Sequence, residues 1–200
     1  MKPKTRFAAQ RPYKPPEAAT MPRIIVYRPW QAGDSPEAVT ELLHHSFSHL
    51  VRMGIPCASG LQPPEQTLAR IQQGTSFVAL DADRIVGTIS VYAAERSSEC
   101  PVYRDHAVAS IHQFAVDPAY QGTGVGDALL RMAECQAKQD GFKFIALDTP
   151  GRAKHLHRYY VHKGFEVVSM LRFKGRQYAS VVLRKVLSDD TGVPPALAWI

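Results

Sequence analysis

The sequence predicts an α+β domain, because segments with the period of a strand and segments with the period of a helix both recur along residues 23–187. The clearest strand is the stretch 111–116, and an amphipathic helix over 125–137 follows it directly after a glycine-rich turn. Side chains of this strand are expected to alternate, with Ile111, Gln113 and Ala115 on one face and His112, Phe114 and Val116 on the other. The expected order is strand, two helices, three strands, helix, strand, helix and two strands, without internal repeats.

Each element begins and ends at residues that favour a boundary. The stretch 33–36 supplies a cap and a first-turn proline for the first helix, and residues 81–84 suit a hairpin turn. Asp117-Pro118 ends the central strand, because proline lacks the N–H that a strand ladder needs. Residues 95–107 are predicted to form a polar loop. The expected strands and helices are, in order, 23–28, 36–50, 64–72, 76–80, 85–92, 111–116, 125–137, 142–147, 153–162, 165–173 and 177–186.

Length and composition suit one globular domain with short extensions, since the chain has 200 residues of which 45% are hydrophobic. No stretch approaches the ~18 apolar residues of a membrane span, and the basic N-terminus lacks the apolar region of a signal peptide. Three cysteines without CxxC spacing indicate a reducing compartment, so a cytoplasmic location is expected. The histidines lack the spacing of a metal site, so no metal is expected.

The net charge of +6 is unevenly distributed along the chain. Residues 1–22 carry five basic and one acidic side chain (+4), residues 23–150 ten and fourteen (−4), and residues 151–187 nine and one (+8). The proline-rich stretch 1–22 predicts a disordered basic arm, in which Met21 is an alternative start, and 188–200 predicts a loose tail. Because the main body is acidic and lacks interleaved basic and aromatic residues, neither nucleic acid nor a membrane is an expected partner.

The turn between the central strand and the next helix has the composition of a phosphate-binding loop. Glycines let the backbone approach an anion, and the helix adds its unpaired first-turn N–H groups and positive dipole end. The Rossmann spacing fails, because Asp127 stands where its third glycine would be, and the Gly-Lys-Ser/Thr of a P-loop is absent. The pattern that fits is Gln-x-x-Gly-x-Gly, formed by Gln121, Gly124 and Gly126.

This pattern resembles the acetyl-CoA pyrophosphate loop of the GNAT N-acetyltransferase family, and the order of elements over residues 23–187 is similar to that family's. A second stretch, Tyr160 to Phe165, resembles the family's Tyr-x-x-x-Gly-Phe box. The chain departs from the family at Ala153, where many members have an asparagine that contacts the cofactor. The resemblance implies the GNAT fold, a mixed, largely antiparallel sheet of six to seven strands that is splayed in the middle and flanked by about four helices.

The resemblance also implies acetyl-CoA as co-substrate. Its pantetheine arm is expected to pair with the exposed backbone of the central strand at Phe114, Ala115 and Val116. The pyrophosphate is expected at the loop residues Gln121, Gly122, Thr123, Gly124, Val125 and Gly126. The basic residues after Arg152 either help to hold the remaining phosphate or form a solvated cationic face.

Acetyl transfer to an amine needs a proton donor for the departing thiolate and a way to deprotonate the amine. Tyr160 is the expected acid, because a phenol matches a thiolate in basicity, and its distance to Gly164 favours it over Tyr159. For the base, Asp148 at the end of a strand is the first candidate, and a role as a helix cap or turn residue is an equal alternative for it. His112 on the central strand is the alternative base, and a water relay is a third possibility.

The sequence therefore predicts an acetyl-CoA-dependent N-acetyltransferase that acts on a primary amine by direct attack in a ternary complex. The alternative is a catalytically weak CoA-binding sensor or regulatory domain of the same fold, and a nucleotide-phosphate enzyme is disfavoured by the failed P-loop. The acceptor is a small-molecule amine or a peptide or protein amine, and the acidic body favours a cationic one. A homodimer is an open alternative to a monomer.

Overall fold

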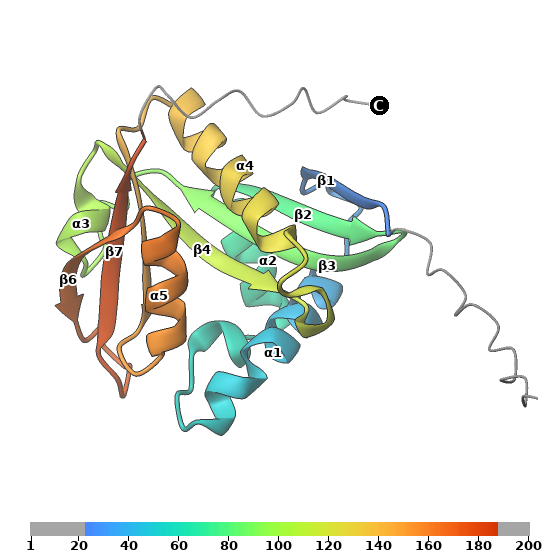
Figure 1. The fold of residues 1–200 in the computed structure, drawn as a ribbon, viewed down its shortest axis with the longest axis horizontal. Coiled ribbons are helices and arrows are strands. Elements are labelled where there is room, and N and C mark those ends of the chain that lie inside the picture. Colours follow the sequence, from blue (N-terminus) through green and yellow to red (C-terminus); the bar gives the residue numbers. More distant parts are fainter. Residues whose placement is uncertain (1–22, 188–200) are drawn as a thin grey trace, which may run out of the picture.

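Seven strands and five α-helices form residues 23–187, the part of the chain that the structure, a computed structural model, describes (Figure 1). The strands are β1 Ile25–Pro29, β2 Thr75–Asp81, β3 Arg84–Tyr92, β4 Val108–Val116, β5 Phe144–Pro150, β6 Glu166–Leu171 and β7 Ser180–Val186. The helices are α1 Pro36–Arg52, α2 Pro64–Gln72, α3 Pro101–Arg104, α4 Val125–Gln139 and α5 Lys154–His162. The expected arm, 1–22, and tail, 188–200, lie outside the described residues.

Every expected helix and strand is present, although most ends shift by a few residues. The helix α2 has the expected bounds, whereas β5 begins at Phe144 and continues to Pro150, beyond the expected 142–147. The helix α3 lies in the expected polar loop, because four residues are too few to show a helical period. None of the helices in residues 23–187 is long and apolar enough to cross a membrane.

The strands form one sheet in the order β1-β2-β3-β4-β5-β7-β6. Only β4 and β5 are parallel neighbours, and the other pairs are antiparallel, which confirms the expected mixed sheet. The helix α4 lies across one face of the sheet, and α1 and α2 lie against the other (Figure 1). The sheet is therefore the middle of three layers.

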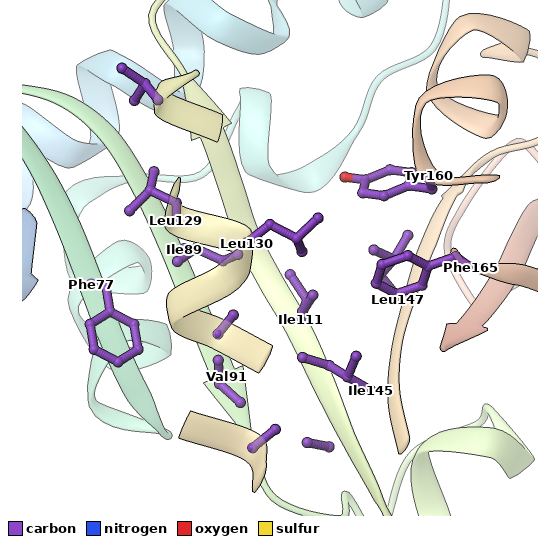
Figure 2. Close-up of a cluster of buried hydrophobic side chains, with 14 of the residues drawn as sticks. Phe77, Ile89, Val91, Ile111, Leu129, Leu130, Ile145, Leu147, Tyr160 and Phe165 are labelled. Atoms are coloured by element: carbon purple, nitrogen blue, oxygen red, sulfur yellow. The ribbon is translucent and has the colours of Figure 1, made fainter. Parts of the chain in front are cut away.

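A hydrophobic cluster on each face holds the layers together, since burial of apolar surface is the main driving force of folding. The cluster under α4 contains Phe77, Ile89, Val91, Ile111, Leu129, Leu130, Ile145 and Leu147, and extends to Tyr160 of α5 and to Phe165 after this helix (Figure 2). The cluster under α1 contains Val39, Leu42, Leu43, Val78 and Ala115. Together they fix the central strand β4 between two helical layers.

The sheet is splayed between its two parallel strands. Residues 108–110 of β4 pair with residues 144–146 of β5, and beyond this point the strands diverge. The strand β4 continues to Val116 and β5 to Pro150, so each leaves an edge of backbone without a neighbouring strand on that side. This arrangement confirms the splay that the family resemblance implies.

A β-bulge interrupts the central strand at Gln113, whose φ of 47° lies in the left-handed region. The register between β3 and β4 shifts between Thr88 and Ser90, opposite this residue. The expected strict alternation is therefore wrong: Phe114 and Val116 pack with Ile111 in the cluster under α4, whereas Ala115 packs on the other face. One extra residue in a strand reverses the facing of every side chain that follows, which hydrophobic period alone does not reveal.

Candidate active site

A cavity of about 980 Å³, called here the main cavity, lies where β4 and β5 diverge. Most of the residues predicted from the sequence line it: His112, Phe114, Ala115, Val116, Gln121, Gly122, Gly124, Gly126, Asp148 and Tyr160. The side chains of Thr123 and Val125 do not. Val125 is buried in the core, and the Thr123 hydroxyl donates to the Tyr120 carbonyl at 2.6 Å. These two residues can therefore contact a phosphate only through their backbone.

The glycine-rich loop ends at the N-terminus of α4, beside the main cavity. Gly122 and Gly124 have φ values of 75° and 93°, which only glycine adopts without strain, and Gly124 is the N-cap of the helix. The first-turn N–H groups of α4 have no intrahelical acceptor and carry the positive end of the helix dipole. The Gln121 side chain donates to the Val116 carbonyl at 3.2 Å and ties the loop to β4. The loop thus has the geometry of a pyrophosphate site.

Tyr160 is buried, and its hydroxyl has no hydrogen-bond partner among residues 23–187. Its ring packs edge-on against Phe165 at 5.7 Å, and Figure 2 shows the hydroxyl pointing away from Phe165 toward the β4 side. Burial, with smaller effects of Tyr159 and Asp148, raises the pKa of Tyr160 well above its usual value, so the phenol stays protonated. The neighbouring Tyr159 differs, because its hydroxyl donates to Asp127 at 3.0 Å.

His112 forms a pair with Glu95, a residue of the loop after β3. The two are joined at 2.8 Å between Nε2 and Oε1, and the Ser110 hydroxyl donates to the same carboxylate oxygen at 2.6 Å. Burial favours the protonated acid, but the bonds from His112 and Ser110 outweigh burial and lower the pKa of Glu95. An ionised Glu95 places the proton of a neutral imidazole on Nε2, which leaves Nδ1 as the basic nitrogen. The ring also stacks on Tyr92, with centroids 4.2 Å apart.

Asp148 is engaged on both carboxylate oxygens. Oδ2 binds Nη1 of Arg176 at 2.5 Å, and Oδ1 accepts from the Tyr103 hydroxyl at 3.2 Å. Burial disfavours the charge on Arg176, but the carboxylate outweighs burial and raises the pKa of the guanidinium. The Arg176 guanidinium also lies over the Phe173 ring, 4.1 Å from its centroid. Asp148 therefore acts in this structure as the partner of a fixed cation.

The comparison with known families decides which family the chain belongs to. The model of the acetyltransferase (GNAT) family matches residues 37–165, which include the glycine-rich loop, β4, β5 and α5. The chain belongs to the GNAT acetyltransferase family. It is an N-acetyltransferase with acetyl-CoA as its co-substrate, as the sequence predicts. At the departure from the family pattern, Ala153 is fully buried before α5, so no amide side chain is available there.

Two curated acetyltransferases are similar in sequence to this chain. S-(2-succino)cysteine N-acetyltransferase of Bacillus subtilis is 27% identical over 156 residues, covering 77% of this chain and 92% of that protein. Aminoalkylphosphonate N-acetyltransferase of Salmonella typhimurium is 27% identical over 89 residues, covering 44% of this chain and 54% of that protein. Among solved structures, yncA from Salmonella typhimurium with its cofactor acetyl-CoA has a TM-score of 0.61 at 19% identity and covers 86% of this chain and 99% of that chain.

Four residues of the site have no local signal in the sequence: Arg70, Glu95, Tyr103 and Arg176. Glu95 reaches His112 because the register of β3 and β4 places Tyr92 opposite Ser110. Arg176 reaches Asp148 from the loop between β6 and β7. Such residues are found only when the pairing of distant strands is known.

Proposed function

We propose that the acetyltransferase acts on the primary amine of a small molecule, by direct attack of the amine on the thioester in a ternary complex. The observation that carries the proposal is that Tyr160 and His112 line the same cavity as the glycine-rich loop. The names of the two curated relatives support a small-molecule acceptor, because succinocysteine and aminoalkylphosphonates are both small amines with acidic groups.

Acetyl transfer forms a carbon–nitrogen bond and breaks the carbon–sulfur bond of the thioester. The amine nitrogen attacks the carbonyl carbon and gives up a proton, and the departing sulfur takes the proton of the Tyr160 hydroxyl. The products are the N-acetylated amine and coenzyme A. The raised pKa keeps the Tyr160 phenol protonated at neutral pH. The same burial makes it a weaker acid than an exposed tyrosine, so its proton moves only as negative charge develops on the departing sulfur.

We infer that His112, held by Glu95, is the base that takes the proton of the amine. The imidazole presents Nδ1 as a free lone pair, because Nε2 is bound to the carboxylate. Asp148 is the weaker alternative, because both of its carboxylate oxygens are already bound, Oδ2 by Arg176 at 2.5 Å and Oδ1 by the Tyr103 hydroxyl at 3.2 Å. We assign Asp148 the role of positioning Arg176.

Variants of the two alternatives test this assignment through the pH dependence of kcat/KM. We expect His112→Gln to lower kcat/KM about 100-fold, the usual scale for a general base, and to flatten the acidic limb of the profile. Asp148→Asn is expected to retain that limb, because the base remains. The acceptor amine titrates equally in all variants, so differences between profiles report the enzyme.

Three other outcomes would change the assignment. If Asp148→Asn flattens the limb and His112→Gln does not, Asp148 is the base. If neither does, a water relay or the free-amine fraction of the acceptor controls the rate. A protein that binds acetyl-CoA and acetylates no amine in a broad panel would instead be a coenzyme-binding regulatory domain.

A further inference from the structure

A second cavity, of about 230 Å³, adjoins the main cavity on the α2 side of the sheet and is called here the acceptor cavity. Its walls come from α2, the loop after β3, α3 and the loop between β6 and β7. Arg70, His112, Asp148 and Arg176 line both cavities. A molecule in the acceptor cavity can therefore lie against the proposed base while it faces the thioester.

The charges in the acceptor cavity are not fully paired. Arg176 is neutralised by Asp148 at 2.5 Å, whereas Glu95 is bound at 2.8 Å to His112, which carries no charge as the proposed base. Arg70, in contrast, has no carboxylate oxygen within 4.0 Å among residues 23–187. The charge of Arg70 also acts on Glu95, but from beyond direct contact. Of the two arginines that line this cavity, Arg70 is therefore the one without direct contact to a carboxylate of the described residues.

Neutral groups hold the Arg70 guanidinium in place. Its Nη1 donates to Gln62 Oε1 at 2.8 Å and to Ser59 Oγ at 3.3 Å. Gln62 is buried, and its own amide donates to Thr67 Oγ1 at 2.7 Å, which turns the amide oxygen toward the arginine. The other N–H groups of the Arg70 fork make no hydrogen bond within residues 23–187. A guanidinium fixed in this way keeps its full charge and its planar fork for a ligand.

We propose that the acceptor is a small primary amine that also bears a carboxylate or phosphonate, and that Arg70 binds this anion. At about 30 Å³ per water, the acceptor cavity has the space of roughly seven or eight water molecules, which suits a molecule of amino-acid size better than a peptide chain. The inference rests on the proposed acetyl transfer, and it differs from the cationic acceptor that the acidic body favours.

The test compares amines that differ only in the anion. Wild-type enzyme is assayed by coenzyme A release and by mass spectrometry of the products with the twenty α-amino acids and their amides. The panel also contains 2-aminoethylphosphonate against ethanolamine, and spermidine as a cationic amine. We expect at least one acid to exceed its uncharged partner in kcat/KM by about 10- to 100-fold, the range of a charge-assisted hydrogen bond.

Arg70→Gln then identifies the residue that makes this difference. We expect the KM of the preferred acid to rise about tenfold or more with little change in kcat, because the anion is held equally in ground and transition states. The KM of the uncharged partner and the affinity for acetyl-CoA should stay near wild type. Arg172→Gln is the matched control, because Arg172 is exposed and lines neither cavity. Arg70→Lys keeps the charge without the fork and should fall between wild type and Arg70→Gln.

Each outcome separates this inference from the proposed function. Preference for amides or spermidine would overturn the anionic acceptor and leave acetyl transfer standing. An acid preference that survives Arg70→Gln would overturn the role of Arg70. Acetylation of no amine, with acetyl-CoA still bound, would overturn the proposed function itself. If Arg70→Gln does not fold, the ratio of kcat/KM for acid and amide in the wild type still tests the anionic acceptor, and the Arg70→Lys variant still tests the role of Arg70.

Discussion

Replacement of the two adjacent tyrosines of α5 by phenylalanine should separate catalysis from stability. The Tyr160 hydroxyl makes no hydrogen bond within residues 23–187, so Tyr160→Phe removes only the proposed acid. We expect kcat to fall about 100-fold, equivalent to about 2.7 kcal/mol of transition-state stabilisation. The free energy of unfolding should change by less than about 1 kcal/mol, because the ring keeps its contacts with Tyr159 and Phe165.

Tyr159→Phe should show the opposite pattern. It deletes the hydrogen bond to Asp127 at 3.0 Å, which we expect to cost about 1 kcal/mol of stability and about 2–4 °C in Tm. Asp127 keeps Lys163 as a partner at 2.7 Å, so the loss stays moderate, and kcat should remain near wild type. Steady-state kinetics at saturating acetyl-CoA and calorimetry of both variants provide the measurements. The reasoning would be refuted by a Tyr160→Phe enzyme whose kcat lies within twofold of wild type.

Two further perturbations test the coenzyme loop and the entry to α1. Gly124→Val should abolish the rise in Tm that acetyl-CoA causes, because the φ of 93° at Gly124 excludes a β-branched residue. The control Gly33→Ala should keep this rise, because the backbone at Gly33 is not left-handed. An unchanged rise in Gly124→Val would contradict the phosphate site. Asp34→Asn should lower stability at pH 7 by about 1–3 kcal/mol, since Arg28 donates to both carboxylate oxygens. The Arg28 hydrogen bond lowers the pKa of Asp34, so this stabilisation is present above about pH 4 and is lost as the pH falls further. A difference between wild type and variant that does not shrink as the pH falls below about 4 would argue against the ion pair.

Local sequence was sufficient to predict the order of elements, and it is also the basis for the predicted coenzyme loop and candidate acid. Hydrophobic period identifies strands and helices because each buries one face or stripe, and Gly124 marks the loop because its backbone conformation requires glycine. The prediction of Tyr160 as the acid depends on its short spacing to Gly164. The stretch between these two residues lies within α5 and the turn that follows it. Such features depend on residues that are close in the chain.

Only the tertiary structure decided which groups surround the reacting atoms. The bulge at Gln113 reverses the faces of β4, and the period of a strand cannot reveal one inserted residue. Glu95 meets His112, and Arg176 meets Asp148, through strand registers and loops that join residues 17 and 28 positions apart. Arg70 enters the acceptor cavity from α2, for which the sequence predicts a short helix and no binding role. Charges and proton partners at the site depend on these long-range pairings, whereas the fold follows from patterns that each segment carries by itself.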